Sequence, residues 1–431
     1  MKKTPLFLTR SNPYSSITAT FRQEKDCRLV RRTNLARLLP FSKEFVYYIH
    51  MRRPISAIIF ALSLSLLNVP PASAAAPTSN CRFTGDTQIK SGIKYVCLYY
   101  KGKSTWIHVP KVKISKLAQY EQTKLKAYKE IRKQIATTEP KNIQLKFFIS
   151  DNFPKDLRTK YVAQINLATR LYDQFFAPET PINVYFKTEK DEKFIDSTPV
   201  LSRQKQDYSN FLDYWRANTN TSQVVGLIAI FTEYTGKAEG HTGVILSSKT
   251  NAKSVEIYSE QVVPHEYFHV VQDYFKYKRD QVGYADADEI DTNYRPIFRE
   301  GSANTISTAL AMDSFETYLL FYRAFIAQNK GEGAWPPFNT FTKKENVIAA
   351  LKSLELRSND RSINMPQFVL GSLVFEWLIA EYGFDSYKKL IYNQSLNINF
   401  EENLKLSLGI TSDQLYDLSS NHIMQAFKFR F

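Results

Sequence analysis

The sequence H-E-Y-F-H at residues 265–269 constrains the fold of this chain more than any other feature. His265 and His269 are four positions apart, and side chains at this spacing share one face when the segment is an α-helix. Two imidazoles on one helix face can bind a single metal ion, and the glutamate after the first histidine then points at a water on that ion. Pro264 fits if the helix begins a residue or two earlier, because first-turn N–H groups lack partners within the helix. The alternative is a buried helix whose histidines are only hydrogen-bonded.

A third candidate ligand lies downstream, in F-R-E-G-S-A-N at residues 298–304, with thirty residues between His269 and Glu300. A catalytic zinc ion takes three protein ligands and a water, so two histidines require one further donor. Glu300 can supply it. The alternative for Glu300 is a solvated carboxylate at the start of a helix.

The two motifs HEYFH and FREGSAN together resemble the gluzincin zinc peptidases, the superfamily of thermolysin and the zinc aminopeptidases. In that superfamily the third ligand is a glutamate on a following helix, often within E-G-x-A. The resemblance implies a Zn²⁺ ion held by His265, His269 and Glu300, with Glu266 as the general base and a peptide or protein as substrate. It also implies a thermolysin-like domain.

Three features near these motifs correspond only in part to the gluzincin pattern. Asn304 lies one helical turn after Glu300, where thermolysin-like enzymes have an acidic residue that orients a ligand histidine. An amide oxygen can still accept the ring N–H, although an asparagine without a metal role fits as well. The segment 240–246 occupies the place of the gluzincin edge strand, along which substrate backbone pairs. Glu239 is out of register with the aminopeptidase signature, so we do not expect an aminopeptidase.

The position of the tyrosine that stabilises the oxyanion in many gluzincins is held by Phe368, followed by Gly371. A phenyl ring cannot donate a hydrogen bond, so another group must act as the donor or activity is reduced. His241, between two glycines beside the expected edge strand, and Tyr294, six residues before Glu300, are the candidates. For His241 the alternative is a turn histidine that faces solvent.

Residues 51–76 have the layout of a secretory signal peptide. Two arginines follow Met51, an apolar run covers residues 55–69, and small residues then offer cleavage sites near Ala75. We expect a secreted or extracytoplasmic protein that starts at Met51, with residues 1–50 an over-extended start. The alternative is a cytoplasmic tail on an uncleaved anchor, which would be the only route to a membrane, although the apolar run is short for a span.

Cys81 and Cys97 are the only cysteines after this leader, which predicts a disulfide in an exported chain. Short β-rich runs and turns predict a small disulfide-closed β module at residues 77–110. Helical spacing predicts a linker helix at 111–140. The main domain, 141–431, has alternating strand patterns followed by helical patterns after residue 257, which is typical of an α+β fold.

Basic residues are concentrated in the leader and the region before it. The whole chain has a net charge of +15, but residues 1–76 hold 12 of the 57 basic and three of the 42 acidic residues. The other 355 residues have only six more basic than acidic residues. A surplus this small is typical of a solvated surface rather than a nucleic-acid interface. We therefore expect no nucleic-acid partner; no sequence feature indicates an oligomeric state.

The sequence as a whole predicts a secreted zinc-dependent hydrolase, most simply a peptidase. The competing hypothesis, favoured by Phe368, is a catalytically inactive zinc-binding protein of the same fold that binds envelope peptides or glycans.

Overall fold

The computed structural model places one compact unit at Pro70–Phe431. Within the chain it describes residues 76–78, 81, 84–100, 103–135, 139–179, 181–188, 228–230, 243–248, 261–281, 295–329, 340–355, 361–396 and 398–428. The expected leader, apart from Ala76, and the region before it lie outside these residues, as do His241 and Tyr294.

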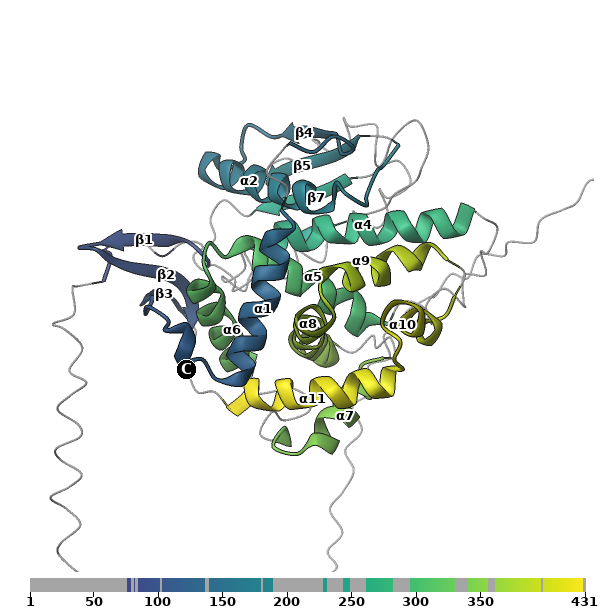
Figure 1. The fold of residues 1–431 in the computed structure, drawn as a ribbon. Helices are drawn as coiled ribbons and strands as arrows, with labels where there is room; N and C mark the ends of the chain where they lie inside the picture. Colours follow the sequence, from purple (N-terminus) through teal and green to yellow (C-terminus); the bar gives the residue numbers. More distant parts are fainter. Residues whose placement is uncertain are drawn as a thin grey trace, which may run out of the picture. The chain divides into compact units, whose positions relative to one another are not determined.

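The first element is a small antiparallel sheet of three strands in the order β1-β2-β3 (Figure 1). The strands are β1 (Thr87–Lys90), β2 (Ile93–Tyr100) and β3 (Lys103–His108). Cys81 and Cys97 lie at disulfide-bonding distance, as the sequence predicts, with an S–S separation of 2.02 Å. The Lys94 ammonium lies 2.8 Å from the Asp313 carboxylate, so the small sheet is tied directly to the helices that follow.

Helix α1 (Gln119–Lys133), after a short 3-10 turn η2 (Ile114–Lys116), coincides with the segment expected to be a linker. It packs against α8 and buries Lys124, whose ammonium lies 2.6 Å from the buried Glu376 carboxylate. The Tyr128 hydroxyl donates to the carbonyl of Met312, just past the end of α5. Loss of one partner of a buried ion pair typically costs about 3–5 kcal/mol. Helix α1 is therefore part of the helical core.

The second sheet has four described strands in the order β4-β5-β7-β6. They are β4 (Leu145–Ile149), β5 (Ile182–Thr188), β6 (Ile228–Ile230) and β7 (Gly243–Ser248). Strands β4, β5 and β7 are parallel, and β6 is antiparallel to β7. The expectation that residues 240–246 form the edge strand is wrong, since β7 has neighbours on both sides. Among the described strands the edge position beside β7 belongs to β6.

Helices make up most of the remaining described chain, which is α+β as predicted. They are α2 (Lys155–Tyr172), α4 (Val262–Gln281), α5 (Pro296–Ala311), α6 (Phe315–Asn329), α7 (Lys344–Ser353), α8 (Arg361–Tyr382), α9 (Phe384–Tyr392), η5 (Asn393–Ser395), α10 (Phe400–Leu408) and α11 (Ser412–Lys428). Helix α4 contacts β6 and β7 on one side and α5 and α9 on the other, so it lies between the sheet and the C-terminal helices (Figure 1). Across the described residues, we find no helix with the length and hydropathy needed to span a membrane.

Helices α5 and α8 approach each other closely at two glycines. A Cβ atom added to Gly301 would lie 2.4 Å from the carbonyl carbon of Gly371. A Cβ atom added to Gly371 would lie 2.4 Å from the carbonyl oxygen of Ile297. The absence of side chains at these two positions lets the backbones meet, one residue after Glu300 on α5 and three residues after Phe368 on α8.

Candidate metal centre

Helix α4 brings His265 and His269 together, as their spacing predicts. The helix starts at Val262, so Pro264 falls in the first turn, where its missing N–H is not needed. The His265 N–H then makes an i to i−4 bond with the carbonyl of Gln261, at 2.9 Å. Both histidine side chains are buried, with exposed fractions of 8% and 6%.

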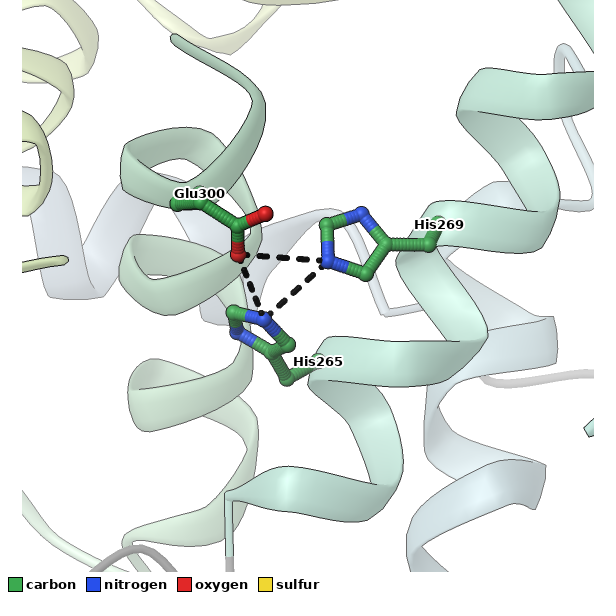
Figure 2. A group of neighbouring side chains, drawn as sticks. All are labelled: His265, His269 and Glu300. Atoms are coloured by element: carbon green, nitrogen blue, oxygen red, sulfur yellow. Dashed lines mark hydrogen bonds and ion pairs between the residues drawn. The ribbon is translucent and has the colours of Figure 1, made fainter. Parts of the chain in front are cut away.

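Glu300, on the second turn of α5, points its carboxylate at both imidazoles (Figure 2). The two histidine Nε2 atoms are 3.1 Å apart. The Glu300 Oε2 atom lies 3.2 Å from Nε2 of His265 and 3.4 Å from Nε2 of His269. Ligand atoms bound to one tetrahedral zinc ion at about 2.0–2.2 Å are about 3.3 Å from one another, so this triangle has the size that the ion requires.

The electrostatics of the three side chains favour a positive charge between them. Burial raises the pKa of the Glu300 carboxyl, but the two histidines lower it by more, and the result lies well below the ordinary value. Burial lowers the pKa of His269, but Glu300 raises it by more. The carboxylate is thus ionised and attracts a cation, which is the condition for a metal ligand.

Glu266 follows His265 on α4 and is partly exposed. Burial raises the pKa of its carboxyl group, and the nearby histidines offset only part of that shift. A carboxylate that is held in a less solvated position is a stronger base than a free one, which suits it to take a proton.

Gln272, one turn after His269, makes a hydrogen bond to a candidate ligand histidine, a role for which the sequence suggested Asn304. Its Oε1 atom lies 2.7 Å from Nδ1 of His269. Asn304 instead accepts a hydrogen bond from the Gln261 amide at 3.1 Å and donates to the Phe368 carbonyl at 3.3 Å. Sequence reasoning missed Gln272 because its role depends on how α4 and α5 face each other, although its i+3 position after His269 was a usable signal.

Phe368 lies beside His265, as its place in the sequence motif suggests. Its ring centroid is 5.7 Å from that of His265, with a tilted geometry. The position thus contributes an apolar face and no hydrogen-bond donor. His241 and Tyr294, the candidate donors, lie outside the described residues.

Within the part of the chain that the structure describes, His265, His269 and Glu300 form the group of side chains that could hold a metal ion. The chain matches no family model, no curated protein and no solved structure.

Proposed function

We propose that this chain is an exported zinc-dependent hydrolase of the peptidase type, with a gluzincin-like arrangement of ligands and a thermolysin-like domain. The observation that carries the proposal is the triangle of Nε2 and Oε2 atoms, 3.1 to 3.4 Å apart, on two consecutive helices. The order of the elements supports it as well, since a mixed sheet precedes the helix with both histidines, and the helix with the glutamate follows.

Zinc bound between His265, His269 and Glu300 would supply Lewis acidity, which polarises a scissile carbonyl and makes water a better nucleophile at neutral pH. Glu266 would take the proton of the attacking water and deliver it to the leaving amine. The side chains that would hold the ion are one carboxylate and two imidazoles, the set used in thermolysin and carboxypeptidase A, and three protein ligands would leave room for a water.

A peptide substrate is supported by the sheet edge that contacts helix α4. Strand β6 lies at the edge of the described sheet next to β7, and both strands contact α4. An extended peptide can add to such an edge through main-chain hydrogen bonds, which places its carbonyl groups along the metal-binding helix.

The second candidate function is zinc-dependent peptide binding without catalysis, and the apolar Phe368 ring beside His265 favours it. An oxyanion donor is commonly worth about 3–4 kcal/mol of transition-state stabilisation, so a site without one would bind peptides better than it cleaves them.

The experiment that separates these functions uses the chain from Pro77 onward, loaded with zinc and mixed with denatured protein substrates. The hydrolase proposal predicts cleavage by the wild type and a loss of about a hundredfold to ten-thousandfold in Glu266→Gln, because the amide cannot accept a proton. Zinc content should be equal in the two proteins. Equal cleavage by both would reject Glu266 as the base, and no cleavage by the wild type with zinc bound would favour the binding function.

A further inference from the structure

The orientation of the Gln272 side-chain amide follows from its neighbours on α5. Its Nε2 atom lies 3.3 Å from the backbone carbonyl of Arg299 and 3.1 Å from the hydroxyl of Ser302. A carbonyl oxygen can only accept, so the NH₂ group must face α5. The Ser302 hydroxyl donates to the same carbonyl at 3.2 Å, which leaves its oxygen lone pairs for the Gln272 N–H. The Gln272 carbonyl oxygen therefore faces His269.

This orientation determines which nitrogen of His269 carries the proton. The Gln272 Oε1 atom has no hydrogen, so at 2.7 Å it must accept a hydrogen bond from Nδ1 of His269. A neutral imidazole with its proton on Nδ1 has its lone pair on Nε2, and Nε2 is the atom that faces His265 and Glu300. Gln272 thus selects the tautomer in which His269 can bind a metal ion.

The same side chain also links the two helices that carry the ligands. Gln272 and Ser302 have no exposed surface, so their hydrogen bonds are shielded from water. The Arg299 carbonyl directly precedes Glu300 in the chain, and Gln272 lies three residues after His269. The buried Gln272 side chain therefore connects α4 to α5. Its contacts lie within three residues of His269 on α4 and of Glu300 on α5.

An amide, unlike a carboxylate, adds no charge to the site. The other buried network between α4 and α5 is neutral too, because Gln261 donates to Asn304 and accepts from Thr308. Histidine ligands commonly bond to a carboxylate or carbonyl through the second nitrogen, and a carboxylate there raises the basicity of the ligand. Gln272 orients the His269 ring without adding a negative charge.

We propose that Gln272 is a positioning residue of the metal site, which holds His269 in its metal-binding tautomer and fixes α4 to α5 beside Glu300. The inference rests on the proposed zinc function. Removal of the acceptor oxygen should weaken zinc binding by about tenfold to a hundredfold, the usual effect of losing such a partner. A glutamate at this position keeps an acceptor for Nδ1 but cannot donate to the Arg299 carbonyl or the Ser302 hydroxyl, so it should lose less zinc affinity than a side chain without an acceptor.

Zinc affinity of the metal-free chain from Pro77 onward, measured by competition with a chromophoric chelator, tests this role directly. The variants are Gln272→Met, which keeps the length of the side chain without an acceptor, and Gln272→Glu. We expect weaker binding in both variants, with the larger loss in Gln272→Met, which lacks the acceptor for His269. Equal affinity in Gln272→Met and wild type, or a loss in Gln272→Glu as large as that in Gln272→Met, would overturn the inference. A wild type that binds no zinc would overturn the proposed function itself.

A second readout needs no variant of Gln272 and is independent of activity. Nitrogen-15 NMR of histidine-labelled, metal-free chain reports the tautomer of each ring, with His269 assigned by the loss of its signals in His269→Asn. We expect Nδ1 of His269 to carry the proton and Nε2 to be unprotonated at a pH where the ring is neutral. A ring protonated on Nε2 would overturn the inference even if Gln272→Met fails to fold.

Discussion

At the scale of single residues, the candidate metal site brings three possible ligands together beside the apolar ring of Phe368. His265 and His269 share one face of α4 because they are four positions apart, whereas Glu300 reaches them through the packing of α5 against α4. The spacing therefore predicted the two histidines and the motif resemblance predicted Glu300, while the role of Glu266 stays a prediction. The sequence could not predict which way the Gln272 amide faces at His269, because that orientation depends on the contacts of Gln272 with Arg299 and Ser302 on α5, which no local pattern encodes.

Phe368→Tyr is the substitution that tests the missing donor. The ring already lies beside His265, so a tyrosine hydroxyl would extend from the same position on α8. Loss of one oxyanion donor usually lowers kcat by about 10²–10³, and we expect the added hydroxyl to raise kcat by about tenfold with zinc content unchanged. Phe368→Leu serves as the control for ring packing. A tyrosine variant with the kcat of the wild type would show that this position takes no part in the reaction.

At the scale of elements, the α5–α8 contact explains why glycine follows Glu300 and why it recurs at residue 371. Both glycines lie within helices, where alanine is ordinarily better by about 0.5–1 kcal/mol. Here a Cβ atom added to Gly301 or Gly371 would lie 2.4 Å from a backbone atom of the other helix. The sequence contains both glycines within recognisable motifs, but the reason for them is the helix crossing. The position of β6 at the sheet edge was not predictable either, because the apolar run that contains Ile228–Ile230 indicates a strand but not which strands lie beside it.

Gly371→Ala should therefore destabilise the protein, against the usual gain in helix propensity. Overpacking of a tight contact costs about 1–3 kcal/mol, so we expect a lower free energy of unfolding by that amount in a urea titration. Zinc affinity should fall as well, because the α5 backbone next to Glu300 is displaced. A Gly371→Ala variant that is more stable than the wild type would contradict the close approach of the two helices.

At the scale of the whole molecule, one buried charged cluster connects distant parts of the chain. The Glu376 carboxylate accepts from Lys124 on α1, Tyr318 on α6 and His422 on α11, at 2.6, 2.6 and 2.8 Å. The sequence predicted α1 from its helical spacing but assigned it to a linker. Lys124 gave no sign of burial, because lysines on a helix usually face solvent and only the tertiary fold supplies Glu376.

Acid should weaken the fold through His422. Burial lowers the pKa of this histidine, and hydrogen bonding to Glu376 offsets only part of the shift. Below about pH 6.5 the unfolded chain therefore binds a proton that the folded chain does not, and stability falls as the pH decreases toward the folded pKa. Glu376, whose pKa is lowered by Lys124 and His422 despite burial, adds a further loss at lower pH.

The variant His422→Gln keeps a donor for Glu376 and does not titrate. We expect the wild-type melting temperature to fall between pH 7 and pH 5, and the decrease to be smaller in His422→Gln. If the melting temperatures of the two proteins fell by the same amount between pH 7 and pH 5, groups other than His422 would be the cause of the acid sensitivity.

The central claim is that His265, His269 and Glu300 together hold one metal ion, and metal analysis of the purified chain from Pro77 onward tests it most directly. After incubation with zinc and removal of the excess, the wild type should retain about one zinc per chain, and His269→Ala should lose most of it. His108→Ala, a change at an exposed histidine on β3, should behave as the wild type. Full zinc occupancy in His269→Ala, or no zinc in the wild type, would contradict the account.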